Sequence, residues 1–193
     1  MASASIAVVV LAGGKARRFP HKLEQSINGV PLIVHCYRAL RQTPWPIYIA
    51  GNGPFSPDVE KLLDAELLLD RWPGRGPLHA LVSACGAIEA ERIFAVAADM
   101  PQLDPGVLEQ LAAAWQPGNE AVVPQHDDRI EPLAALYERR AVLREGFDLF
   151  SSGGGAMRQL VARLATRFVP FDARYFYNVN RPEDVAGITA VAR

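Results

Sequence analysis

Uninterrupted apolar runs along this chain alternate with longer segments in which apolar positions recur at helical spacing. The first run, Ile6–Leu11, is rich in β-branched residues and has no polar alternation, which is typical of a strand covered on both faces. Similar short runs predict strands over 47–50, 66–69, 93–98, 121–124 and 132–137, with 167–170 as a candidate for a last one.

Helical spacing and end signals predict helices between these strands. Pro31 suits the first turn of a helix that continues to Leu40, and Asp104-Pro105 supplies an N-cap and a first-turn proline for a helix that reaches Trp115. Further helices are expected over 58–64, 78–90 and 139–149, from the 151–155 glycine loop to 164, and from Pro182 onward. The charged stretch 126–131 is expected to be an exposed loop.

This alternation predicts an α/β fold. We expect one domain over residues 1–193, a three-layer αβα Rossmann-like arrangement around a mainly parallel mixed sheet. Four of the predicted strands run into glycine or polar residues: Gly13-Gly14, Asn52, Asp70 and Asp99. Because ligands bind at the carboxyl ends of the strands in such sheets, these residues predict a site on one rim.

Composition narrows the kinds of partner. The 193 residues carry a formal net charge of −1, which gives no support to nucleic-acid or anionic-membrane binding. No apolar stretch reaches the ~20 residues that span a bilayer, and the N-terminus lacks a secretory signal, so the expected compartment is the cytoplasm. Cys36 and Cys85 lie in apolar helical contexts and are expected to be buried free thiols.

The candidate chemistry begins where the first strand ends. Gly13-Gly14 is followed within eight residues by four cations: Lys15, Arg17, Arg18 and Lys22. Glycines let a phosphate approach backbone N–H groups, and the cations would neutralise it. The spacing matches neither the Walker A loop nor the dinucleotide-binding glycine motif. A plain strand-to-loop turn with exposed bases is the alternative.

This stretch resembles the L-A-G-G-x-x-x-R-[MF]-G-…-K signature of nucleotidyltransferases with a GT-A-like fold. Leu11-Ala-Gly-Gly14, Arg18-Phe19 and Lys22 match, whereas Pro20 stands where glycine is usual. The resemblance implies that Arg18 and Lys22 are catalytic and neutralise a triphosphate. It implies nucleotide contacts from Leu11, Ala12, Gly13, Gly14 and Lys22.

A second stretch makes the resemblance narrower. Asp70, a short loop and Gly76-Pro-Leu78 before a helix look most like the molybdenum cofactor guanylyltransferases. The resemblance places Asp70 and Gly76 near the base, where a carboxylate suits the two adjacent N–H donors of guanine. Asn52 is a further candidate for a base contact. The alternative for Asp70 is a strand-end aspartate that caps a turn.

Two later motifs imply a metal site. Asp99-Met-Pro101 resembles the family's D-x-P metal-binding motif, and Asn178-Val-Asn-Arg-Pro-Glu-Asp184 resembles the N-x-N-[TR]-P-E-D that closes these enzymes. The resemblance implies that Asp99 and Asn180 hold Mg²⁺ against the triphosphate, which also makes Asp99 a nucleotide-binding and catalytic residue. A plain loop aspartate is the alternative for Asp99.

The acceptor side is less defined. Arg129-Ile-Glu-Pro-Leu-Ala-Ala-Leu-Tyr137 resembles the family's R-x-[HE]-P-L-x-A-x-Y strand, which often carries histidine where this chain has Glu131. Arg129 and Asn178 are the candidates for acceptor binding, with a surface loop as the alternative for Arg129. The loop from Ser152 to Arg158 is either a phosphate cradle or a plain helix-entry loop.

The resemblance covers almost the whole chain and implies a reaction. GMP from GTP would be joined to the terminal phosphate of molybdopterin or its molybdenum form, with release of pyrophosphate. A related enzyme that uses CTP or another phosphorylated acceptor is the first alternative, and a non-catalytic nucleotide-binding regulatory module is the second. Whether partner proteins deliver the substrate or collect the product is left open.

Overall fold

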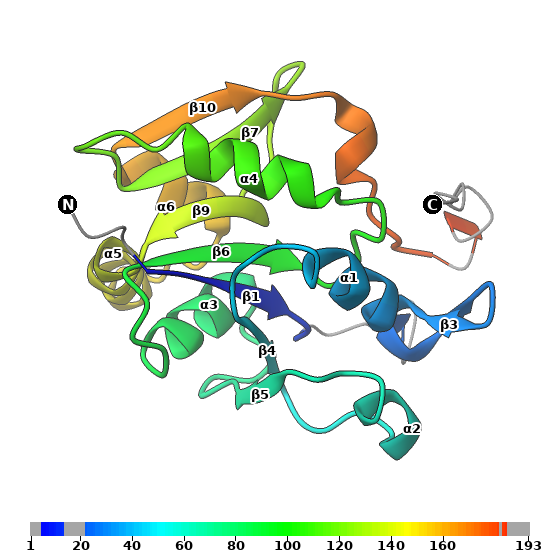
Figure 1. The fold of residues 1–193 in the computed structure, drawn as a ribbon. Coiled ribbons are helices and arrows are strands. Elements are labelled where there is room, and N and C mark those ends of the chain that lie inside the picture. Colours follow the sequence, from blue (N-terminus) through cyan, green and yellow to red (C-terminus); the bar gives the residue numbers. More distant parts are fainter. Residues whose placement is uncertain (1–4, 14–21, 182, 185–193) are drawn as a thin grey trace.

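A mixed sheet forms the centre of the molecule (Figure 1). The computed structural model describes residues 5–13, 22–181 and 183–184. Within these residues the strands follow the order β10-β7-β9-β6-β1-β4-β5, and β8 pairs with β7. Their bounds are β1 (Ile6–Leu11), β4 (Ile47–Gly51), β5 (Glu66–Leu69), β6 (Arg92–Ala97), β7 (Ala121–His126), β8 (Arg129–Ile130), β9 (Ala134–Glu138) and β10 (Thr166–Pro170).

The parallel half of the sheet carries the predicted rim. β6, β1, β4 and β5 are neighbours and parallel, whereas β9 is antiparallel to both β6 and β7. Leu11 pairs with Ala97 and with Ala50, and Gly51 pairs with Leu69. This register ends the four strands at one level, so the residues that follow them lie along the same edge.

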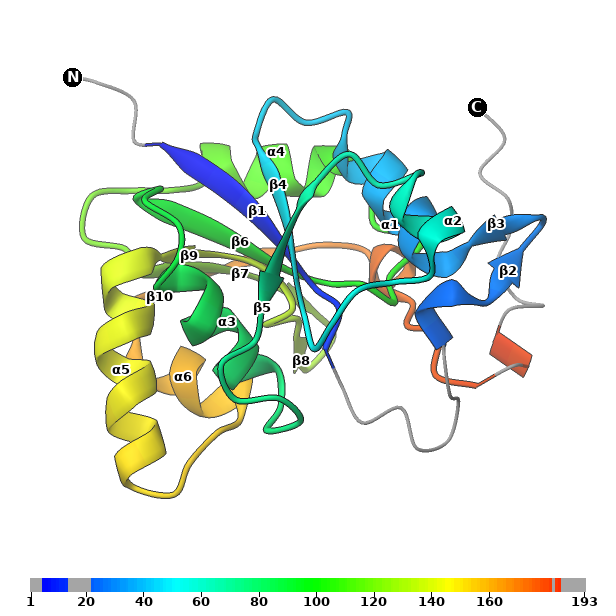
Figure 2. The same ribbon diagram turned by 90° about the horizontal axis from the view of Figure 1, so that it is seen from below.

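Helices cover both faces of the sheet (Figure 2). The apolar side chains of β1 alternate between two cores: Val8 and Val10 belong to one, and Ala7, Val9 and Leu11 to the other. The first core includes residues of α1 (Leu32–Leu40) and α4 (Pro105–Ala113), and the second includes residues of α3 (Pro77–Cys85), α5 (Arg139–Ser151) and α6 (Met157–Arg163). The expected three-layer αβα architecture with a mainly parallel mixed sheet is therefore confirmed.

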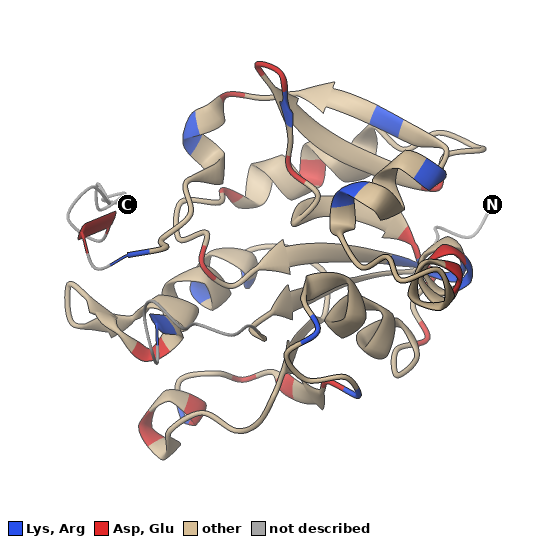
Figure 3. Ribbon diagram, turned by 180° about the vertical axis from the view of Figure 1, so that it is seen from behind, with Lys and Arg blue, Asp and Glu red and all other residues tan. Residues whose placement is uncertain are grey.

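Smaller elements lie beside the carboxyl ends of β1 and β6, at the right of Figure 1. They are the 3₁₀ helices η1 (Lys22–Glu24) and η2 (Ala173–Phe176), the hairpin of β2 (Ser26–Ile27) and β3 (Val30–Pro31), and the one-turn helix α2 (Pro57–Glu60). Positive and negative residues are interspersed over the described chain (Figure 3), and α5 carries both signs.

The sequence predicted the first strand and the 32–40 helix with the bounds that the structure shows. Asp104 also caps α4 as expected, since its Oδ1 accepts a hydrogen bond from Gly106 N at 2.8 Å. Cys36 and Cys85 are buried free thiols, and burial raises the pKa of each to about 12.

The helix expected to reach Trp115 ends two residues earlier, at Ala113, and three predicted elements differ further from the structure. The helix expected over 78–90 ends at Cys85, because Gly86, with its low helix propensity, follows and starts a turn. The helix expected over 58–64 ends at Glu60, since so short a segment does little more than nucleate.

The third correction is the expected exposed loop at 126–131. β7 continues to His126 and β8 pairs back onto it, with Asp127 at φ 48° in the turn. The side chains of His126 and Glu131 are only 10% and 18% exposed. The predicted helix that Pro182 opens lies outside the described residues. No helix of the described chain has the length and apolar character needed to cross a membrane.

Candidate functional site

A lysine and an aspartate from distant parts of the chain meet at the rim. Asp99 follows β6, and the strand end is fixed because Ala98 N donates to Leu11 O at 3.2 Å. Lys22 opens η1, and its Nζ lies 2.6 Å from Asp99 Oδ2. The two side chains are 16% and 19% exposed, so this ion pair is largely shielded from water. An ammonium group therefore occupies a cation position on the carboxylate that the sequence predicts to hold a metal.

The segment that ends the described chain is bonded to the backbone of Asp99. Val179 N donates to Asp99 O at 2.9 Å, and the fully buried Val179 side chain packs with Ile27 and Leu32. Asn178 and Asn180 thus flank the residue that contacts Asp99. Asn180, the second predicted metal-binding residue, thus directly follows the residue whose backbone N–H bonds to Asp99.

A second carboxylate orders this segment. Asp184 Oδ2 accepts hydrogen bonds from Asn180 N at 2.7 Å and from Arg181 N at 2.8 Å. The first of these bonds is the largest of several causes that lower the pKa of Asp184, and the positive charge of Lys22 is a smaller one. Asp184 is therefore a structural acceptor near the Lys22–Asp99 pair. Groups of three or more His, Cys, Asp or Glu placed to hold a metal are absent from the described residues.

The loops after β1 and β4 come together at Gly13. Ala12 N donates to Ala50 O at 2.8 Å, and a Cβ on Gly13 would lie 3.3 Å from Asn52 Oδ1. A side chain there would crowd Asn52, which explains why glycine suits the position. Leu11 and Ala12 supply the end of this strand, while Gly14 and Arg18, also predicted site residues, lie outside the described part of the chain.

Asp70 is tied into the turn that follows β5. Asp70 N donates to Gly51 O at 2.8 Å, and Asp70 Oδ1 accepts from Trp72 N at 2.9 Å. The turn-capping role that the sequence analysis gave as an alternative is therefore present. Its contact with a base stays a prediction. Gly76 follows as the N-cap of α3 at φ 105°, a backbone conformation that favours glycine.

A cavity of about 420 Å³ opens next to these residues. Arg129 and Asn178, the two predicted acceptor-binding residues, line it together with Arg158 and Glu131. Its remaining walls come from Pro77, Met100, Ile130, Pro132, Leu133, Ala156 and Met157. Met100, which directly follows Asp99 in the chain, is part of this wall, so the cavity lies one residue along the chain from the Lys22–Asp99 pair.

Sequence reasoning missed the partner of one wall residue, Glu131. His126 Nε2 lies 2.8 Å from Glu131 Oε1 across the β7–β8 hairpin. The available signal was the position of Glu131, next to Arg129 in a motif that often carries histidine there. The partner could not be identified without the hairpin register, since the region was predicted to be a loop.

Comparisons with known proteins agree over nearly the full chain. The family model for the MobA-like NTP transferase domain matches residues 8–173. A probable molybdenum cofactor guanylyltransferase of Geobacillus sp. strain WCH70 is 30% identical over 187 residues, covering 93% of this chain and 95% of the relative. One from Mycobacterium avium strain 104 is 32% identical over 195 residues, covering 96% of each. The crystal structure of molybdopterin-guanine dinucleotide biosynthesis protein A from Archaeoglobus fulgidus superposes with a TM-score of 0.72 at 26% identity, covering 95% of both chains.

Proposed function

This chain belongs to the MobA-like NTP transferase domain family and is a nucleotidyltransferase, and from that premise we propose that it transfers GMP from GTP to molybdopterin. The acceptor atom is an oxygen of the terminal phosphate of molybdopterin or its molybdenum form, and pyrophosphate is the leaving group. The observation that carries the proposal is the Lys22–Asp99 pair, a cation and a carboxylate one residue along the chain from Met100, which lines a cavity together with two arginines.

The nucleotide lies along the rim in this proposal. Gly13 leaves room for the triphosphate beside Asn52, and Lys22 contacts its oxygens. Asp70 and Gly76 lie at the end of the rim where the base binds, as the family resemblance implies. Gly14 and Arg18 join the triphosphate site on the resemblance alone.

The residues around Asp99 fit Mg²⁺. The 2.6 Å approach of the Lys22 ammonium to the Asp99 carboxylate supports this fit, because the carboxylate already pairs with a cation. A carboxylate from Asp99 and an amide oxygen from Asn180 are hard oxygen donors of the kind that Mg²⁺ takes while keeping several waters. When bound, the metal would supply charge neutralisation on the triphosphate.

The acceptor occupies the cavity. Its phosphate lies at the end formed by Met100 and Asn178, next to Asp99, and attacks the α-phosphorus in line with the pyrophosphate leaving group. A phosphate monoester is already anionic near neutral pH, so this attack needs no general base. Positioning and charge neutralisation then account for most of the catalysis.

The test is a pyrophosphate-release assay with molybdopterin, Mg²⁺ and each of GTP, CTP, ATP and UTP. Release with GTP supports the proposal, and preferential release with CTP would support the related cytidylyl transfer instead. Asp99→Ala is expected to lose activity while keeping the wild-type circular dichroism spectrum. Asp148→Asn, which alters an exposed carboxylate on α5, is the control and should keep full activity. Wild-type turnover in the Asp99 variant would remove the role given to that residue.

A further inference from the structure

Glu131 is an acid in a cavity wall that also contains two arginines, and its backbone and side chain are both fixed. Glu131 N donates to Pro124 O at 2.9 Å, which holds the residue just beyond β8. Its Oε1 lies 2.8 Å from His126 Nε2, and the carboxylate is 18% exposed. Glu131 is therefore a wall residue of the cavity whose backbone and side chain are each held by a hydrogen bond.

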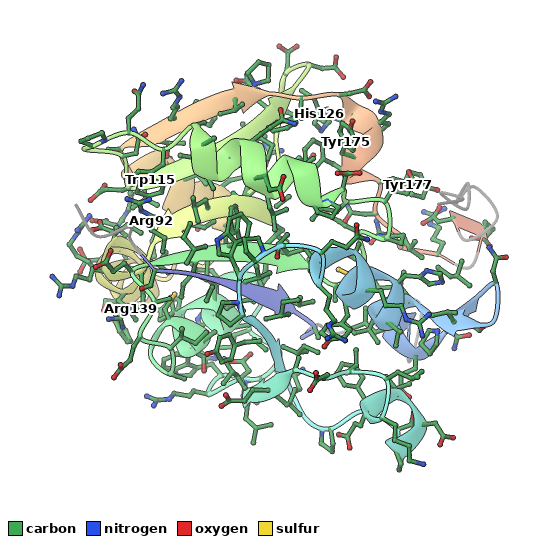
Figure 4. The ribbon with its side chains drawn as sticks, viewed as in Figure 1. Arg92, Trp115, His126, Arg139, Tyr175 and Tyr177 are labelled. Carbon is green, nitrogen blue, oxygen red and sulfur yellow. The ribbon has the colours of Figure 1, made fainter. Side chains whose placement is uncertain are left out.

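His126 is a rigid support for that carboxylate. Because a carboxylate only accepts hydrogen bonds, Nε2 carries the proton and donates it. The imidazole stacks on Phe176 with centroids 5.4 Å apart and planes at 7°, next to the turn that carries Tyr175 (Figure 4). Asn178 belongs to the same assembly, since its Nδ2 donates to Phe176 O at 3.3 Å.

The charges of the wall indicate what Glu131 binds. Arg129 and Arg158 suit the anionic end of an acceptor, but a ligand that is only anionic has no use for an acid beside them. A carboxylate instead matches two adjacent N–H donors. Because each of its oxygens can accept two hydrogen bonds, the bond from His126 leaves both oxygens able to accept one from a ligand. A pterin ring presents such an edge, formed by its ring N3–H and its 2-amino group.

We propose that Glu131 determines acceptor specificity by accepting two hydrogen bonds from the 2-amino and N3–H groups of a pterin bound in the cavity. This inference rests on the proposed function, because the cavity must hold the acceptor. The volume of about 420 Å³ is within the range of small-molecule sites and suits a bicyclic ring with a substituent. His126 is a positioning residue, since it acts on the ligand only by holding the carboxylate.

The test compares two fluorescent probes that differ at the recognised edge. Pterin has the 2-amino group, whereas lumazine has a carbonyl there and would place an oxygen against the carboxylate. Equilibrium dialysis with the full chain measures the Kd of each probe. We expect the wild type to bind pterin about ten-fold more tightly than lumazine or better, since a charge-assisted hydrogen bond is lost and a repulsion is added.

Glu131→Gln is the test variant, because an amide can still accept the bond from His126 but cannot accept from two adjacent donors. It should lose the pterin preference and favour lumazine, because its oxygen can accept from N3–H while its NH2 donates to the 2-carbonyl of lumazine. Asp128→Asn is the matched control in the turn of the same hairpin, where the residue is exposed. It should keep the wild-type preference.

Equal affinity of the wild type for pterin and lumazine would overturn the assignment, and so would an undiminished preference in Glu131→Gln. The proposed function fails separately. Pyrophosphate release from GTP without any pterin preference contradicts the role of Glu131 alone. A Glu131-dependent pterin preference without pyrophosphate release contradicts the transfer reaction and supports the pterin site.

Discussion

Replacing Lys22 by glutamine removes the cation that now neutralises Asp99. At 2.6 Å the gross attraction is about 6 kcal/mol for an effective dielectric constant near 20, but desolvation of both groups offsets most of it. Unpairing a fully buried ion pair costs about 3–5 kcal/mol, whereas an exposed pair is worth about 0–1 kcal/mol. The side chains are 16% and 19% exposed, so we expect a loss of about 2 kcal/mol.

The same substitution should create a site for a free metal ion. In the wild type, Lys22 competes with any cation for Asp99, so Mg²⁺ without nucleotide should stabilise the protein little. In Lys22→Gln the carboxylate is unpaired, and a cation at about ten times its Kd would return about 1.4 kcal/mol. We therefore expect metal to enter the wild-type enzyme together with the triphosphate, which takes Lys22 away from Asp99.

Thermal unfolding with and without Mg²⁺, in the absence of nucleotide, measures both effects. The variant should unfold about 4–8 °C below the wild type and should recover much of this difference when Mg²⁺ is added. Mn²⁺ binding followed by electron paramagnetic resonance gives the Kd directly. Lys61→Gln, which removes an exposed pair with Asp58, should change neither quantity. An unchanged melting temperature, or a response to Mg²⁺ no larger than that of the wild type, would refute this reasoning.

Three further predictions concern the scaffold. Gly146→Ala should destabilise the protein by about 1–3 kcal/mol in urea titrations without changing GTP affinity, because its Cβ would collide with Val82 Cγ2 where α5 packs on α3. Glu120 has a pKa below its ordinary 4.5, chiefly because Ala165 N donates to it and then because Arg144 does. The stability that the Glu120 carboxylate contributes is present above its unfolded-state pKa and is lost as the pH falls through its folded-state pKa. Glu120→Gln lacks this contribution, so its free energy of unfolding should fall less than that of the wild type between about pH 6 and about pH 3. Both cysteine thiols are buried with a pKa of about 12, so a thiol reagent at about pH 8 should modify them only after urea unfolds the chain.

Elements formed by local patterns could be predicted from the sequence. The side chains of the apolar run Ile6–Leu11 are removed from water only when the strand is covered on both faces. Pro31 directly precedes the helix that ends at Leu40. The placement of the polar strand ends on one edge of the sheet could also be predicted, because the carboxyl ends of parallel strands lie on the same side. Where a local signal was weak, as at Gly86, the apolar spacing continued past the true end of the helix.

Contacts between distant residues could not be predicted in the same way. Lys22 and Asp99 were both assigned to the site, one to the triphosphate and the other to the metal, but their direct ion pair depends on how η1 packs beside β6 across 77 residues. The His126–Glu131 pair depends on a two-residue hairpin strand that composition cannot distinguish from a loop. The outcome for Gly14 and Arg18 is not defined by the described residues.

The central claim is that this protein joins a guanylyl group to molybdopterin, and the mass of the product tests it most directly. The full chain is incubated with GTP, molybdopterin and Mg²⁺, and the pterin products are separated and measured by mass spectrometry. The account predicts a species heavier than molybdopterin by one guanylyl group, formed in a one-to-one ratio with pyrophosphate. Unmodified molybdopterin with GTP, or a cytidylyl adduct formed in preference when CTP is also present, would contradict it.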